Sequence, residues 1–234
     1  MSSERPYKHL FFDLDHTLWD FDRNSRETIG DLFREFNLVE LGFADFEEFF
    51  DTYHKVNEQY WRFYRQGKVS KAQLRVGRFR DTLIAKKYDD EKLSEQLADF
   101  YVSHGPLKTN LFPGAIEALK YLSERYVLHL ITNGFKEVQH IKVERSGLKP
   151  FFDEFIISEE IGFQKPHPEI FRFANMRTAS KPGESMIIGD NLEADIAGGR
   201  NAGWGQVFFN PHKKEHIEQI THEIHTLDQL AQFL

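Results

Sequence analysis

The chain has 234 residues and a formal net charge of −7, and hydrophobic residues make up 40% of it. This composition is that of a globular protein, and the 23 Phe residues argue against disorder. Because the chain has no Cys, disulfides, thiolate metal sites and a Cys nucleophile are excluded. The net negative charge and the lack of long Lys or Arg runs argue against a nucleic-acid partner, so an anionic substrate would have to be attracted by local positive charge.

The start of the chain, MSSERPYKHL, is polar and lacks the apolar region of a signal peptide. No window approaches the roughly 18 consecutive apolar residues of a membrane span. We therefore expect a cytoplasmic protein with no membrane partner. The sequence leaves the oligomeric state open.

Short apolar runs alternate with helical segments along most of the chain. This alternation predicts an α/β fold with a Rossmann-like parallel sheet flanked by helices on both faces. The expected strands are residues 9–14, 126–132, 154–158, 185–190 and 205–210, and the expected helices are residues 113–124, 135–146, 166–178, 192–202 and 226–234.

Residues 19–104 break this alternation, since they contain no convincing strand. Their aromatic residues recur at three- and four-residue spacings, which indicates about four helices packed through aromatic side chains. A helical block of this length is too long for a crossover between strands. We therefore predict an α/β core of residues 1–18 and 105–234, with residues 19–104 inserted as an all-helical cap domain.

The first candidate motif is FFDLDHTLWD, in which Asp13 and Asp15 follow an apolar strand. Side chains two residues apart on a strand point to the same side, so both carboxylates can face one site. Ligand sites of open α/β sheets lie at the carboxyl ends of the strands, which is where these residues fall. An isolated Asp-x-Asp is nevertheless more often an ordinary strand end or turn.

The second motif is LITNGF, where Thr132 and Asn133 follow a strand and Gly134 precedes a helix. A hydroxyl, an amide and free N–H groups at a helix start can together bind an anion, although Asn-Gly is also an ordinary turn.

Two further motifs lie in the second half of the chain. Lys165 precedes a Pro in GFQKPHPEIF, and Asp190 ends an apolar strand with Asp195 five residues later. Taken singly, Lys165 reads as a surface lysine and Asp195 as a helix cap.

Taken together and in this order, the four motifs resemble those of the haloacid dehalogenase superfamily. The family pattern is Asp-x-Asp-x-Thr, a strand-end Thr or Ser, a Lys, and Gly-Asp followed by another Asp. The resemblance implies that Asp13 attacks phosphorus and becomes phosphorylated, while Asp15 protonates the leaving oxygen and later activates water. It also implies that Thr132 and Lys165 contact the phosphoryl oxygens, with support from Asn133 and Gly134, and that Asp195 positions Lys165 or a metal-bound water.

The resemblance further implies a Mg²⁺ cofactor, with Mn²⁺ or Co²⁺ as substitutes, held by Asp13, the backbone carbonyl of Asp15, and Asp190. Such a cation is needed because the four Asp side chains and Lys165 sum to −3 before an anionic substrate arrives. Haloacid dehalogenases lack the second Asp of the first motif, so Asp15 favours phosphate transfer over cleavage of a carbon–halogen bond.

Outside the core motifs, the stretches WDFDRN, 56–79 and 131–166 resemble pyrimidine 5′-nucleotidases of the YjjG type. This resemblance implies a small phosphorylated substrate, a nucleoside monophosphate with a pyrimidine base. The cap residues that we expect to contact the base and sugar are Asn57, Trp61, Tyr64 and Arg78. For Trp61 and Tyr64, simple packing within the cap is an equal alternative.

Two other functions stay open. The same four motifs would serve a phosphatase of sugar phosphates or phosphoglycolate, or a phosphomutase. A non-catalytic binding protein of the same fold is disfavoured because it would not need all of Asp13, Asp15, Lys165 and Asp190.

Overall fold

The computed structural model describes residues 6–234, and the chain divides into two compact units. Unit 1 comprises Met1–Phe21 and Thr109–Leu234, and unit 2 comprises Asp22–Lys108. That these units act as the catalytic core and the cap of the enzyme remains a prediction. Within residues 6–234, no helix is long and apolar enough to cross a membrane.

Unit 1 is built on a six-stranded sheet in the order β3-β2-β1-β4-β5-β6, and every neighbouring pair is parallel. The predicted fold class is thereby confirmed, and all five predicted strands are present. The sixth strand was not predicted, because its sequence HEI is short and largely polar. The strands are β1 His9–Phe12, β2 Val127–Thr132, β3 Glu154–Ile157, β4 Ser185–Gly189, β5 Gly205–Phe209 and β6 His222–Ile224.

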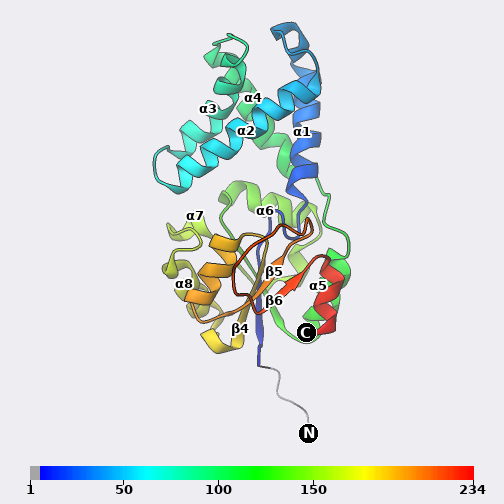
Figure 1. Cartoon of the computed structure of the whole chain (residues 1–234), viewed down its shortest axis with the longest axis vertical. Coiled ribbons are helices and arrows are strands. Elements are labelled where there is room, and N and C mark those ends of the chain that lie inside the picture. Colours follow the sequence, from blue (N-terminus) through cyan, green and yellow to red (C-terminus); the bar gives the residue numbers. More distant parts are fainter. Residues whose placement is uncertain (1–5) are drawn as a thin grey trace. The chain divides into compact units, whose positions relative to one another are not determined.

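The two faces of the sheet are covered by different helices, which lie on opposite sides of the strands in Figure 1. Leu10 and Phe12 of β1 pack with residues of α5 (Ala115–Ser123) and α6 (Lys136–Arg145) on one face. Phe11 points the other way and packs with α8 (Pro168–Thr178). This alternation follows from the two-residue repeat of a strand, and burial of both faces explains why the strands read as continuous apolar runs.

Three segments of unit 1 differ in detail from the helices expected from the sequence. The predicted helix 192–202 is a π-helical turn, Leu192–Ala197, followed by the short helix α9 Gly198–Asn201. The carboxyl-terminal segment forms a 3₁₀ helix, Leu227–Gln232, and α7 (Ser158–Ile161) was not predicted. Short helices of this kind lack the repeated apolar spacing that identifies a long helix in sequence.

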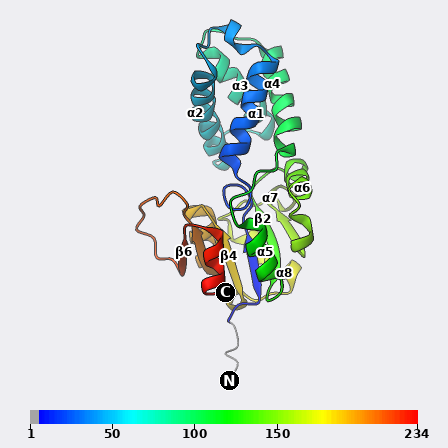
Figure 2. The same ribbon diagram turned by 90° about the vertical axis from the view of Figure 1, so that its right-hand side faces the viewer.

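Unit 2 is helical, as expected, and its four α-helices are seen side by side in Figure 2. The side chains of Asp45, Ser70 and Asp90 accept hydrogen bonds from backbone N–H groups at the starts of three of them. Its core is rich in aromatic residues, including Phe43, Phe49, Tyr53 and Phe79. The helices are α1 Phe21–Glu35, α2 Phe46–Arg65, α3 Lys71–Ile84 and α4 Glu91–His104.

The two segments of unit 1 that lead into and out of unit 2 are hydrogen-bonded to each other. Trp19 and Leu111 form an antiparallel bridge. The Phe112 N–H donates to the Leu18 carbonyl at 2.9 Å, and the Asp20 N–H donates to the Asn110 carbonyl at 3.0 Å. Unit 2 is therefore inserted between two adjacent antiparallel segments.

Candidate active site

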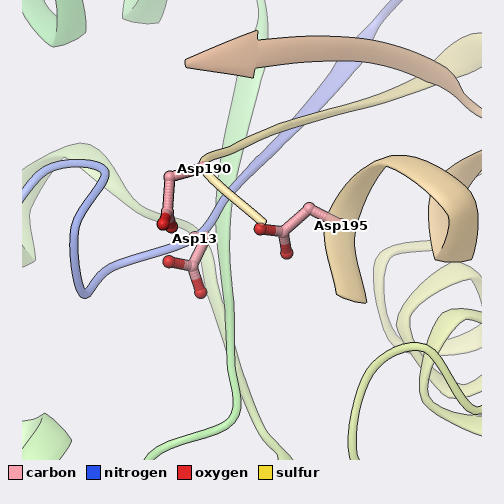
Figure 3. Close-up of side chains that lie close together, drawn as sticks. All are labelled: Asp13, Asp190 and Asp195. Carbon is pink, nitrogen blue, oxygen red and sulfur yellow. The ribbon is translucent and has the colours of Figure 1, made fainter. Parts of the chain in front are cut away.

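The candidate site lies at the carboxyl edge of the sheet, where β1 and β4 are neighbours. Asp13 follows β1, Asp190 follows β4, and Asp195 extends from the π-helical turn toward both (Figure 3). One carboxylate oxygen from each of these residues lies within 4.8 Å of the others. In the order β3-β2-β1-β4, chain connections run to opposite sides of β1, and this is where open α/β sheets bind ligands.

A buried lysine joins two of these carboxylates. Lys165 Nζ lies 2.8 Å from Asp13 Oδ1 and 2.6 Å from Asp195 Oδ1, and it also donates to the Ile131 carbonyl at 2.8 Å. The side chain is only 2% exposed. Lys165 is therefore a fixed cation within the site and not the surface lysine that its sequence context alone suggests.

The loop carrying Lys165 is held by Asn133. The Asn133 amide donates to the Lys165 carbonyl at 2.9 Å and accepts from the Lys165 N–H at 2.7 Å. Thr132 is buried beside it, and its hydroxyl oxygen accepts from Gln139 at 2.7 Å and faces the Gly134 N–H at 3.4 Å. Because this oxygen already accepts hydrogen bonds, its own proton can be donated to a phosphoryl oxygen.

The position of the Asp195 carboxylate depends on Gly189. A Cβ atom on Gly189 would lie 2.3 Å from Asp195 Oδ2, so only glycine lets this carboxylate approach the end of β4. The same oxygen accepts from the Asn191 N–H at 3.0 Å. With its other oxygen on Lys165, Asp195 has both oxygens hydrogen-bonded within the protein.

The site is short of positive charge. Burial raises the pKa of Asp13 to about 7, with Lys165 opposing the shift and Asp195 and Asp15 adding to it. Burial, and then the charges of Asp13 and Asp195, raises the pKa of Asp190 as well. Burial alone would lower the pKa of Lys165, but Asp13 and Asp195 outweigh it and the pKa is raised. The lysine thus stays charged while the carboxylates still repel one another.

The donor set fits a hard divalent cation. The Thr17 hydroxyl lies 3.4 Å from Asp13 Oδ2 and 3.3 Å from Asp190 Oδ1, but it has one proton to donate. At least one of these carboxylate oxygens therefore lacks that donor. Carboxylate oxygens in this situation are the ligands that Mg²⁺ prefers, and Asp13 and Asp190 could hold it together.

Asp15 is bound by two residues that the sequence reasoning missed. Its carboxylate contacts Lys142 Nζ at 2.5 Å and Gln139 Nε2 at 2.9 Å, both from α6. Counting Lys142, the two lysines and the four Asp side chains Asp13, Asp15, Asp190 and Asp195 sum to −2. The structure buries this Gln and this Lys three residues apart on the helix after LITNGF, and no local sequence pattern distinguishes them from solvated residues.

The four residues proposed to contact base and sugar all lie in unit 2. Asn57 and Arg78 are buried and bonded to each other, Arg78 Nη1 donating to Asn57 Oδ1 at 2.9 Å. Trp61 and Tyr64 are half-buried and lie edge to face, with ring centroids 5.9 Å apart. Their contact with a substrate stays a prediction.

The fold and the site define a class of protein, and the sequence comparison agrees. Residues 7–203 match the haloacid dehalogenase-like hydrolase family, so the chain belongs to that family. The expectation of a hydrolase of this superfamily is confirmed.

Two similar relatives are bacterial nucleotidases. The chain is 34% identical over 229 residues to pyrimidine 5′-nucleotidase YjjG of Escherichia coli, covering 96% of each chain. It is also 34% identical to pyrimidine 5′-nucleotidase PynA of Streptococcus pneumoniae, covering 97% of this chain and 95% of the relative. Among solved structures, the magnesium-bound HAD-hydrolase YfnB of Bacillus subtilis superposes with a TM-score of 0.87 at 29% identity, covering 97% of this chain and 98% of that one.

Proposed function

We propose that the protein is a magnesium-dependent phosphomonoester hydrolase that acts on pyrimidine nucleoside 5′-monophosphates. The observation that carries this proposal is the buried Asp13 carboxylate, held by Lys165 beside Asp190 at the carboxyl edge of the sheet. A carboxylate is a suitable covalent nucleophile for a phosphoryl group, and Lys165 supplies positive charge beside it.

In the proposed reaction an oxygen of Asp13 attacks phosphorus, and the bond from phosphorus to the leaving oxygen breaks. Asp15 gives its proton to that leaving oxygen. Asp15 then takes a proton from water, whose oxygen attacks the phosphorus of the aspartyl-phosphate and releases Asp13 and phosphate. Lys165 and the Thr132 hydroxyl contact the phosphoryl oxygens, and Asn133 and Asp195 hold Lys165 in place.

The proposed Mg²⁺ would be held by Asp13, Asp190 and the backbone carbonyl of Asp15, with Mn²⁺ or Co²⁺ as substitutes. When bound, it would neutralise negative charge on the phosphoryl group and on the two carboxylates. With a divalent cation, the sum over Lys142, Lys165 and the four Asp side chains rises from −2 to zero. The magnesium in the similar YfnB structure supports this assignment.

The substrate class rests on the relatives and on the helical unit. YjjG and PynA, each matched over nearly the whole chain, are pyrimidine 5′-nucleotidases. We assign the recognition of the leaving group to unit 2, with Trp61 and Tyr64 offering aromatic rings and Asn57 and Arg78 offering polar groups. An aromatic ring can stack on a base, and an amide can hydrogen-bond to the edge of a pyrimidine.

A second candidate is a phosphatase of small sugar phosphates. Glyceraldehyde 3-phosphate phosphatase of Methanothermobacter thermautotrophicus is 34% identical, although only over 126 residues and 52% of this chain. The same phosphatase of Methanocaldococcus jannaschii is matched over 97% of this chain, but at 28% identity. The higher identity of the two nucleotidases over nearly the whole chain favours the nucleotidase.

One panel of substrates tests both candidate functions, the nucleotidase and the sugar phosphatase. Phosphate release from uridine, thymidine and deoxyuridine monophosphates is compared with release from glyceraldehyde 3-phosphate, phosphoglycolate and 4-nitrophenyl phosphate, with and without Mg²⁺. We expect kcat/KM to be highest for the pyrimidine nucleotides and activity to vanish after chelation. Higher kcat/KM for a sugar phosphate would overturn the nucleotidase assignment, and inactivity on every phosphomonoester would overturn the phosphohydrolase assignment.

A further inference from the structure

Two side chains of α6 contact the active site without a part in the reaction proposed above. Lys142 Nζ lies 2.5 Å from Asp15 Oδ1, and Gln139 Nε2 donates to Asp15 Oδ2 at 2.9 Å. Each oxygen of the Asp15 carboxylate therefore has its own donor. Two donors from one helix fix both the position and the rotation of the carboxylate plane.

These donors are themselves held in place. Lys142 is 5% exposed, and its ammonium group lies 4.1 Å from the centre of the Trp19 ring. Gln139 is 1% exposed and also donates to the Thr132 hydroxyl at 2.7 Å. A Cβ atom on Gly134 would lie 2.2 Å from Gln139 Nε2, so the glycine of the LITNGF motif makes room for this side chain.

The backbone of Asp15 is bridged to Trp19, but the hydrogen bonds described for its side chain come from α6. Asp15 lies beyond the end of β1 and is followed by His16, whose φ of 66° marks a turn. Its side chain is 24% exposed, in contrast to the buried Asp13. A short carboxylate in a partly exposed turn would adopt several rotamers, so the contacts from α6 determine which one is populated.

Gln139 contacts two residues that have different roles in the proposed reaction. Its amide bridges Asp15, the proposed proton donor, and Thr132, a proposed contact of the phosphoryl group. One side chain therefore links the carboxylate proposed to transfer the proton to the hydroxyl proposed to contact the phosphoryl group. Proton transfer requires the proton donor to lie within hydrogen-bond distance of the reacting oxygen.

We propose that Lys142 and Gln139 are positioning residues that orient Asp15 for both of its proton transfers. This inference rests on the acid and base role of Asp15 in the proposed function. In the first transfer the proton passes from the Asp15 carboxyl to the leaving oxygen as the bond to phosphorus breaks. In the second it passes from water to the Asp15 carboxylate as the new bond from water oxygen to phosphorus forms.

The test compares Lys142→Met with a matched control, Arg145→Met, which removes an exposed cation from the same helix. The value of kcat/KM, which reports the steps up to phosphorylation of Asp13, is measured for 2,4-dinitrophenyl, 4-nitrophenyl and phenyl phosphates and for an alkyl phosphate. A dinitrophenolate leaves without a proton, whereas an alkoxide needs one. We expect Lys142→Met to lower kcat/KM by about 10–100-fold for the alkyl ester and by less than about 3-fold for the dinitrophenyl ester. Arg145→Met should match the wild type throughout.

A second measurement follows the other proton transfer. Because a misplaced Asp15 activates water poorly, acid quenching during turnover of dinitrophenyl phosphate should trap more phosphorylated enzyme in Lys142→Met than in the wild type. Lys142→Arg, which keeps the charge, should recover part of the loss. If Lys142→Met fails to fold, Gln139→Met removes the other donor and should show the same dependence on the leaving group, added to an equal loss for all esters because it also removes the donor to the Thr132 hydroxyl.

The outcomes separate the inference from the function on which it rests. Asp15→Asn is the reference, and it should show the same leaving-group dependence in a stronger form, with no further loss when Lys142→Met is added. If Asp15→Asn shows no such dependence, the proposed role of Asp15 fails. If Asp15→Asn shows it but Lys142→Met lowers kcat/KM equally for all esters, Lys142 only supports the fold and the inference is overturned.

Discussion

The two ends of the sheet in unit 1 bury polar groups that differ in charge: an ion pair at one end and a pair of histidines at the other. At the carboxyl edge, buried Asp13 pairs with the ammonium group of Lys165 at 2.8 Å. Toward the amino ends of the strands, His9 Nδ1 lies 3.0 Å from Nε2 of the fully buried His129, and their rings stack. Burial, and then the neighbouring His9, lowers the pKa of His129 to about 4, so this ring is neutral at neutral pH.

The difference shows how burial and pairing together set the charge of buried groups at the two ends of the sheet. Burial disfavours the charged form of any group, and the histidine pair follows that rule by staying neutral. At the carboxyl edge, Lys165 keeps its charge because it contacts Asp13 and Asp195, although burial raises the pKa of Asp13 itself. Groups kept charged in a buried cluster are candidates for chemistry, whereas neutral ones satisfy packing.

The largest effect should come from replacing the nucleophile. Asp13→Asn keeps the shape of the side chain but removes its nucleophilic oxygen, so turnover should fall by at least about 1,000-fold while thermal unfolding shows a folded protein. Phosphate release measured soon after purification checks this. Residual activity above a few per cent of the wild type, with deamidation back to Asp excluded by mass spectrometry, would rule out the covalent mechanism.

The next effect concerns the second carboxylate of the proposed metal site. Asp190→Ala removes one of two carboxylate ligands, so kcat/KM should fall by about 10–100-fold and the Mg²⁺ concentration for half-maximal activity should rise. Titrating Mg²⁺ into chelator-treated wild type and variant measures both. Full wild-type activity after exhaustive chelation would contradict the metal dependence altogether.

The free energy of unfolding should depend on pH because of His129, which lies toward the amino ends of the strands. His129 is neutral in the folded protein, with a pKa of about 4 against 6.5 in the unfolded chain. As the pH falls, the unfolded state therefore binds a proton at this histidine at a higher pH than the folded state does. Stability due to this histidine is complete above pH 6.5 and is lost as pH falls toward 4, by at most about 3 kcal/mol. Urea unfolding of wild type and His129→Leu between pH 7 and pH 4.5 measures the difference, and parallel curves would refute it.

The last prediction tests whether unit 1 transfers the phosphoryl group without a contribution from Trp61 of unit 2. If Trp61 stacks on the base, Trp61→Ala should lose about 1–3 kcal/mol of transition-state binding toward a nucleotide. The same variant should hydrolyse 4-nitrophenyl phosphate almost normally. An equal fall in kcat/KM for both substrates would identify Trp61 as a packing residue of the helical unit.

Much of the carboxyl edge could be foreseen from the sequence because it depends on strand ends. Asp13, Thr132 and Asp190 each follow an apolar run, and parallel strands bring such positions to one edge of the sheet. Lys165 is a harder case, since it lies in a loop whose path is set by hydrogen bonds to Asn133. Only the order of the motifs pointed to it.

Lys142 and Gln139 could not be found in this way. Long polar side chains on a helix are usually solvated, and a periodicity argument assigns them to the exposed face. Their burial follows from tertiary contacts with Asp15 and Thr132, which no local pattern encodes. The pairing of Asn57 with Arg78 within the helical unit was missed for the same reason.

The antiparallel contact between Leu18–Asp20 and Asn110–Phe112 has a consequence for how such an enzyme diversifies. The chain leaves and re-enters the α/β unit through two adjacent segments already joined by backbone hydrogen bonds, so the junction has the geometry of a hairpin whose loop is 22–108. A hairpin accepts loops of very different lengths without disturbing its stem, because closing a longer loop adds little entropic cost. An inserted unit of a different length, or a short turn, could therefore occupy this position without disturbing the sheet that carries the candidate site.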